Sequence, residues 1–152
     1  MSGISFRAAT AGDLPAIVAL LDDDEHSKGR EDPGLPLDQR YLAAFEAIAA
    51  DPNQMQVVAE LDGAVVGTMQ LSFLPGIAFR GGWRGQIEAV RIAGRLRGRG
   101  FGKKMIEWAV ERFRERGCGM AQLTSMSTRI DAHRFYEAMG WKKSHAGFKL
   151  KL

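Results

Sequence analysis

The stretch that decides the fold is VRIAGRLRGRGFGKK, residues 90–104. It begins as an apolar strand pattern and leads, after residue 100, into an amphipathic pattern typical of a helix. Between the two lie alternate glycines, Gly98, Gly100 and Gly102, which carry no side chain to keep an anion away from the backbone N–H groups. The helix that follows adds its free N–H groups and the positive end of its dipole. This order predicts a phosphate-binding loop.

Cations are crowded into the same loop. Arg97, Arg99, Lys103 and Lys104 are placed where the helix dipole disfavours positive charge by roughly 0.3 to 1 kcal/mol each. A bound phosphate would pair with these cations and with the amides, so we interpret the local conflict as functional.

Two common nucleotide-binding patterns do not fit this loop. The P-loop pattern requires Ser or Thr after Gly102-Lys103, but Lys104 stands there. The dinucleotide fingerprint fails as well, because a glycine comes one place early and no acidic residue follows at about twenty positions.

The rest of the chain alternates between the two periodicities. Strands are predicted at residues 4–8, 56–61, 64–73, 86–92, 120–124, 141–144 and 148–152, and helices at residues 10–21, 37–50, 101–116 and 132–139. Asp62-Gly63 predicts a tight turn, Thr10 with Asp13 resembles a capping box, and residues 22–36 and 75–85 are predicted loops. This order indicates an α/β domain with a mixed sheet covered by helices.

Length and composition predict one domain over residues 1–152. The chain has 152 residues, of which 45% are hydrophobic, enough for a proper core. Its apolar runs are much shorter than the roughly 18 to 20 residues that span a bilayer, and it carries no targeting pattern, so we expect a cytoplasmic protein without a membrane partner. A single cysteine and three histidines without suitable spacing predict no metal site.

Charge is divided unevenly along the chain. Residues 1–76 hold 4 Lys and Arg against 12 Asp and Glu, a net charge of −8. Residues 77–152 hold 17 against 6, a net charge of +11. The basic half predicts a polyanionic partner, either a nucleic acid or a phosphorylated cofactor, and the acidic half predicts a cationic one. Simple solvation of the surface is the alternative.

Two segments carry a family resemblance. Arg95-x-x-Gly98-x-Gly100-x-Gly102 resembles the acyl-CoA motif of the GNAT superfamily of N-acetyltransferases, and residues 132–141, AHRFYEAMGW, resemble the A-x-x-F-Y-x-x-x-G-F segment that follows it in that family. The resemblance implies a GNAT-like α/β (α+β) fold, with a mixed, mostly antiparallel sheet flanked by about four helices. It also implies acetyl-CoA as co-substrate.

The same resemblance implies which residues bind the cofactor. The backbone of Val90, Arg91 and Ile92 would line the pantetheine arm, where the strands are expected to splay. Amides of the loop would hold the pyrophosphate, namely those of Arg97, Gly98, Arg99, Gly100, Phe101, Gly102 and Lys103. The family often carries Asn shortly before the last helix, and here Ser127 would substitute for it.

Acyl transfer to an amine also needs a base and an acid, because an alkyl amine with a pKa near 10 is charged at neutral pH. Strand alternation predicts Glu88 as a buried lone acid that points away from the face of Ala89 and Arg91. Similar enzymes often have Glu at this position, acting as a general base through a water. The resemblance makes Tyr136 the general acid. The alternatives are an ion pair of Glu88 with an arginine and core packing of Tyr136.

The acceptor is expected to be a small-molecule or peptide amine, attracted by the acidic first half. Asp24 and Glu25 are the predicted acidic contacts, and Trp83 with Phe79 the predicted pocket wall. A non-catalytic acyl-CoA sensor is one alternative function. A nucleic-acid binder is another, and it is disfavoured because the acidic half would repel a duplex. An exposed last strand could pair two subunits as a homodimer.

Overall fold

The computed structural model describes residues 3–152. These residues divide into two compact units, one that ends at Gln122 and one that spans Leu123–Leu152. The first unit contains, in order, β1 (Ser5–Ala8), a 3-10 turn η1 (Ala11–Asp13), α1 (Leu14–Asp22), η2 (Glu25–Ser27), α2 (Gln39–Ala50), β2 (Gln54–Leu61), β3 (Ala64–Leu74), α3 (Ala78–Gly81), β4 (Arg84–Ile92), η3 (Gly94–Leu96) and α4 (Phe101–Glu115). Strand β5 (Met120–Leu123) leads into the second unit, which contains α5 (Ile130–Ala138).

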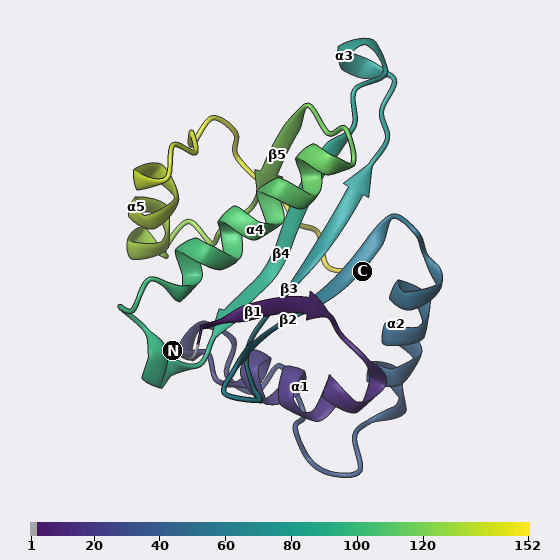
Figure 1. Cartoon of the computed structure of the whole chain (residues 1–152), viewed down its shortest axis with the longest axis vertical. Coiled ribbons are helices and arrows are strands. Elements are labelled where there is room, and N and C mark those ends of the chain that lie inside the picture. Colours follow the sequence, from purple (N-terminus) through teal and green to yellow (C-terminus); the bar gives the residue numbers. More distant parts are fainter. Residues whose placement is uncertain (1–2) are drawn as a thin grey trace. The chain divides into compact units, whose positions relative to one another are not determined.

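The sheet follows the chain, in the order β1-β2-β3-β4-β5, and its first three pairings are antiparallel (Figure 1). The predicted turn between β2 and β3 is confirmed. Asp62 and Gly63 both have positive φ, 53° and 78°, which suits the right-handed twist of a two-residue hairpin. Every strand predicted in the first unit is present, with ends that differ by one or two residues.

One face of the sheet packs under α4. Met69, Leu71 and Phe73 alternate along β3 and are almost fully buried. The ring of Phe113 from α4 meets that of Phe73 edge to face at 5.5 Å between centroids. Phe113 also lies directly over Gly85, where any Cβ would overlap the ring. The predicted apolar face of this helix is therefore confirmed by its buried Met105, Ala109 and Phe113.

The opposite face packs under the first helices. Leu14 and Ile17 of α1 form a core cluster with Val58 of β2. Helix α1 begins later than predicted, because residues 11–13 form a 3-10 turn and Pro15 stands in the first turn of the α-helix, where its missing N–H costs nothing.

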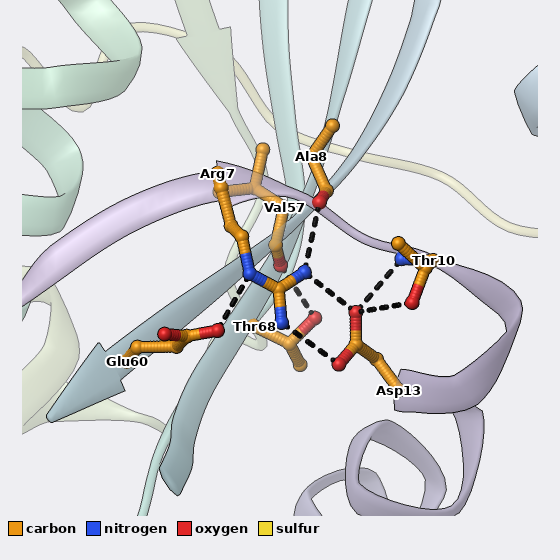
Figure 2. A network of polar contacts seen from close by, with 7 residues as sticks. All are labelled: Arg7, Ala8, Thr10, Asp13, Val57, Glu60 and Thr68. Atoms are coloured by element: carbon orange, nitrogen blue, oxygen red, sulfur yellow. Dashed lines mark hydrogen bonds and ion pairs between the residues drawn. The ribbon is translucent and has the colours of Figure 1, made fainter. Parts of the chain in front are cut away.

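An arginine joins the start of α1 to the sheet (Figure 2). Arg7 donates from Nε to Glu60 at 2.6 Å and from Nη1 and Nη2 to Asp13 at 2.7 and 3.0 Å. The carboxylate of Asp13 also accepts the Thr10 N–H at 2.7 Å, which is the half of the predicted capping box that Asp13 supplies. The bond from Arg7 holds the pKa of Asp13 at about 2. Each charge here has an opposite charge beside it.

In the second unit, helix α5 begins two residues before its predicted start, and an aromatic cluster closes its C-terminal end. The Tyr136 ring lies 5.1 Å from that of Phe135 and 6.1 Å from that of Trp141.

The two strands predicted at residues 141–144 and 148–152 are wrong, because residues 141–152 form neither strand nor helix. A strand needs the backbone of a neighbour, and alternation alone does not supply one. Phe148, Leu150 and Leu152 are instead exposed at 94%, 85% and 115%. The prediction that an exposed last strand pairs two subunits therefore lacks the strand that it requires. Among the helices of residues 3–152, none is long and apolar enough to cross a membrane.

Candidate active site

Strand β4 contains a bulge where it pairs with β3. Gln70 of β3 pairs with Glu88, and Thr68 pairs with Arg91, so that Met69 alone faces both Ala89 and Val90. Ala89 takes a positive φ of 52° at this point. The bulge shifts the alternation by one residue, which puts Arg91 on the same face as Glu88. The prediction that they lie on opposite faces is wrong because it assumed an unbroken strand.

Glu88 is exposed, so the prediction of a buried acid is also wrong. Its Oε1 accepts a hydrogen bond from Nε2 of Gln86, two residues earlier on the same face. Within the described residues Glu88 forms no ion pair, and the alternative of a structural pair with an arginine is not what the structure shows.

On the face of the sheet that carries Glu88, the neighbouring side chains of β2, β3 and β4 are polar and uncharged. The strand register places Gln54, Ser72 and Gln86 in one row across β2, β3 and β4, and Gln56, Gln70 and Glu88 in the next. Gln54 accepts from Gln70 at 2.9 Å and from Ser72 at 2.8 Å. The sequence analysis missed these glutamines. Their signal was a pair of polar residues two positions apart on each of three strands, which places both members of a pair on one face: Gln54 and Gln56, Gln70 and Ser72, and Gln86 and Glu88.

Strand β5 runs beside the first half of β4. The Gly119 N–H donates to the Trp83 carbonyl at 3.0 Å, and Gln122 donates from Nε2 to Gln86 Oε1 at 2.8 Å. Since β5 has 4 residues and β4 has 9, this pairing ends before Val90–Ile92. The predicted pantetheine-binding backbone therefore lies past the end of its pairing with β5.

The glycine loop leads from β4 into α4. Gly98 and Gly100 have φ of 78° and 80°, and Gly100 is the N-cap of α4. A Cβ on either glycine would meet nothing within 4 Å. The left-handed backbone, and not crowding within the protein, is therefore what requires glycine, and the space over both residues is open to a ligand.

The N-terminal end of α4 lacks any counter-charge of its own. No side chain caps it, and its first turn holds no acidic residue. Among the described residues Arg95, Arg97, Arg99 and Lys104 form no ion pair, and Lys103 reaches Glu107 only at 3.8 Å. The Arg99 guanidinium lies over the Phe101 ring, 5.1 Å from its centroid. Free amides and four cations without an ion pair therefore lie together at this helix end, an arrangement that favours a bound anion.

The acidic loop is tied to the bulge by a buried ion pair. Arg91 Nη2 lies 2.8 Å from Asp24 Oδ2, with the two side chains 13% and 5% exposed. The other oxygen of Asp24 accepts the His26 N–H at 3.1 Å, and Arg91 Nη1 donates to the Val90 carbonyl at 2.8 Å. The charge of Asp24 is thus matched inside the protein, whereas Glu25 beside it is exposed.

The remaining predicted residues are found in four places. Trp83 is half-buried at the start of β4, and Phe79 is 75% exposed at the tip of the β3–β4 hairpin, around α3 in Figure 1. Ser127 lies in the turn before α5, which His133 closes by a 2.9 Å contact from Nε2 to the Met126 carbonyl. Tyr136 lies on α5. Across residues 3–152, no three His, Cys, Asp or Glu side chains gather as a metal ion would need.

The fold is an α+β domain with a bulged interior strand, a cationic glycine loop and an uncapped helix, features that suit a protein of the acyl-CoA-binding class. Residues 16–141 match the model of the acetyltransferase (GNAT) family, and the chain belongs to that family. It is an acetyl-CoA-dependent acyltransferase.

The chain is also similar to individual proteins, in sequence or in fold. The chain is 33% identical to an aminoalkylphosphonate N-acetyltransferase of Salmonella typhimurium over 110 residues, which cover 72% of this chain and 71% of the relative. It is 41% identical to a solved structure described as a transcriptional regulator from Bacillus halodurans, with a TM-score of 0.96 and 99% and 100% of the two chains covered. An aminoglycoside N-acetyltransferase in complex with CoA shares the fold at 18% identity, with a TM-score of 0.80 and coverage of 100% and 96%.

Proposed function

We propose that this protein transfers the acetyl group of acetyl-CoA to a primary amine by direct attack in a ternary complex. The observation that carries the proposal is the N-terminal end of α4, where unpaired cations and free amides converge without an acidic residue. The Salmonella relative, named for N-acetylation of aminoalkylphosphonates, supports a small-molecule amine as the acceptor. A peptide amine is the other acceptor class.

The glycine loop is proposed to bind the pyrophosphate of the cofactor. The amides of residues 97–103 would donate to its oxygens, and the side chains of Arg97, Arg99 and Lys103 would offset its charge. The backbone of Val90–Ile92 would hold the pantetheine arm, with Ser127 as a side-chain contact. An N–H near Val90 would polarise the thioester carbonyl.

Glu88 is the proposed general base. The ammonium form of the acceptor must lose a proton before its nitrogen can attack, and an exposed carboxylate can take that proton through one water. The new N–C bond then forms as the C–S bond breaks. The departing thiolate takes a proton from Tyr136, the proposed general acid. The Tyr136 oxygen then recovers a proton from the attacking nitrogen, which loses it as the amide forms. The Tyr136 ring lies against those of Phe135 and Trp141.

The acceptor contacts are proposed from the acidic loop and the start of β4. Glu25 offers an exposed carboxylate to an incoming amine, and Trp83 offers an aromatic wall. Asp24 is proposed to serve the same site by holding the loop against Arg91, since direct contact with the amine would require breaking that ion pair.

A thiol-release screen tests the proposal. The purified protein is incubated with acetyl-CoA and a panel of primary amines that includes 2-aminoethylphosphonate, and free CoA thiol is measured. We expect Glu88→Gln and Tyr136→Phe to retain CoA binding by calorimetry and to lose at least about 100-fold in kcat, within the range for a missing acid or base. Failure of the wild-type protein to bind CoA would refute the assignment.

A second candidate function is favoured by one relative alone. The Bacillus halodurans structure is described as a transcriptional regulator, which would suit a protein that senses acyl-CoA and controls a partner. Under that function CoA would bind, yet no amine in the panel would release thiol. DNA binding that weakens steeply with salt would be its positive signature.

A further inference from the structure

Glu88 is held by only one of its two carboxylate oxygens. Oε1 accepts the hydrogen bond from Gln86, whereas Oε2 receives none from the described residues. An exposed glutamate otherwise samples many rotamers, and a hydrogen bond that fixes such a side chain must offset the loss of conformational entropy. The bond from Gln86 therefore selects one orientation, with Oε2 turned away from its neighbour on β4.

The orientation of Gln86 is in turn fixed from the next strand. Its Oε1 accepts a 2.8 Å hydrogen bond from Nε2 of Gln122, on β5. A carboxamide has its acceptor and its donors on opposite branches, so a Gln86 oxygen that faces Gln122 leaves the NH₂ group for Glu88. The two hydrogen bonds connect Gln122 on β5 to Gln86 on β4, and Gln86 to the Glu88 carboxylate.

These two hydrogen bonds are separate from those of the other glutamines on the same face. Gln54, Gln70 and Ser72 bond among themselves on β2 and β3, and Gln56 donates to the Thr68 hydroxyl at 2.8 Å. None of these bonds reaches Gln86 or Glu88 among the residues described. The polar face around Glu88 thus contains a hydrogen-bond network that includes the Glu88 carboxylate and further hydrogen bonds that do not reach it.

We propose that Gln86 and Gln122 are positioning residues for the transfer reaction. They hold the Glu88 carboxylate by Oε1 so that Oε2 is the oxygen that takes the proton from the acceptor through water. The inference rests on the proposed function, because it assumes Glu88 as the base. Neither glutamine is a catalytic residue, since each acts through Glu88.

Methionine substitutions keep the length of each side chain and remove its hydrogen bonds. With the amine that gives the fastest thiol release in the screen, we expect Gln86→Met to lower kcat about tenfold and Gln122→Met about threefold, since misplacement of a reacting group costs up to about 100-fold. KM for acetyl-CoA should stay unchanged. Gln54→Met, on the separate network, is the matched control and should retain the wild-type kcat.

A double-mutant cycle separates positioning from a structural role. In the Glu88→Gln background, Gln86→Met should cause no further loss of kcat, because the group that it positions is gone. An equal loss in both backgrounds, or a wild-type kcat for Gln86→Met, would overturn the inference. Gln122→Met, which does not touch Glu88, repeats the test if Gln86→Met fails to fold. If Glu88→Gln itself keeps its kcat, the proposed base is wrong, and the inference falls with it.

Discussion

The two ends of helix α4 are built on opposite principles. At the C-terminal end, Gly117 has φ of 78°, and the N–H groups of Gly117 and Cys118 donate to the carbonyls of Arg114 and Phe113 at 3.0 and 2.9 Å. This is the Schellman arrangement that satisfies the last carbonyls of a helix. Arginines in the last turn suit the dipole, and Arg112 also pairs with Glu115 at 2.7 Å.

At the N-terminal end the same helix is left unfinished. Gly100 also has a left-handed φ, 80°, but no side chain caps the amides beyond it. Lys103 and Lys104 stand in the first turn, against the dipole. The protein completes one end with its own groups and leaves the other without a cap, where we propose that the pyrophosphate of the cofactor binds. Unsatisfied charge at a helix end thus indicates function only when the opposite end shows that the sequence can satisfy it.

The largest expected effect comes from the two left-handed glycines. Gly100→Val and Gly117→Val both force a β-branched residue into a left-handed backbone, at about 1 to 2 kcal/mol each. We expect similar losses of stability in urea unfolding. CoA affinity should fall about 100-fold for Gly100→Val alone, because the strained amides leave their bonds to phosphate, worth about 1.5 to 3 kcal/mol each. Titration calorimetry measures the difference.

Gly117→Val is the matched control, since a Cβ at either glycine would meet nothing within 4 Å. An equal loss of CoA affinity in the two variants would mean that strain in α4, and not the loop, controls binding.

The next effect concerns the cations at the two ends. Replacing Arg97 and Arg99 together by Gln should weaken CoA binding about tenfold at low salt, from two charge-assisted contacts of modest strength. The loss should shrink as salt rises, because exposed charges are screened. Arg114→Gln at the other end, which breaks a 3.1 Å pair with Glu111, should leave CoA affinity unchanged. Calorimetry at low and high salt checks both statements.

The sequence predicted the glycine loop and the apolar face of α4 because both depend on local residue order. The alternate glycines and the spacing of Met105, Ala109 and Phe113 are visible without a structure. The bulge at Ala89 was not predictable, since it arises from register against β3. For that reason the face of Arg91 was predicted wrongly. The exposure of Glu88 was also predicted wrongly, because apolar neighbours in the sequence do not show what covers a strand face.

Partners far apart in the sequence were hidden for the same reason. The Asp24–Arg91 pair joins a loop to a strand 67 positions later, and the bond between Gln86 and Gln122 requires β5 beside β4. The strands predicted after residue 140 show the opposite error, in which the sequence predicts structure that is not formed. Their alternating pattern is present, but within the described chain no neighbouring strand pairs with them.

A smaller effect concerns Asp13. This residue places an acid at the N-terminal end of α1, whereas the N-terminal end of α4 has none. Asp13 pairs with Arg7 at 2.7 Å beside the first turn of α1. Its pKa is about 2 in the folded protein and about 3.9 in an unfolded chain. A lowered pKa stabilises the fold above the unfolded value, and this contribution is lost as pH falls from about 4 to about 2.

We expect Asp13→Asn to lose about 1 kcal/mol of stability at pH 7, after allowance for solvent screening around Arg7. The unfolding free energies of variant and wild type should converge as pH falls from 4 towards 2, which urea titrations at several pH values would show. CoA affinity should not change. A constant difference at all pH values would mean that packing, and not the charge of Asp13, is responsible.

The smallest effect should have the opposite sign in the two states of the protein. Lys104 forms no ion pair among the described residues and faces the positive end of the helix dipole. Lys104→Gln should therefore raise the stability of the CoA-free protein by about 0.3 to 1 kcal/mol. With CoA bound, the same change should lower stability relative to wild type, because a cation next to the pyrophosphate is gone. Thermal melts with and without CoA would show the crossing. A variant that is stabilised equally in both states would place Lys104 outside the anion site, because an anion that depends on this charge must weaken when it is removed.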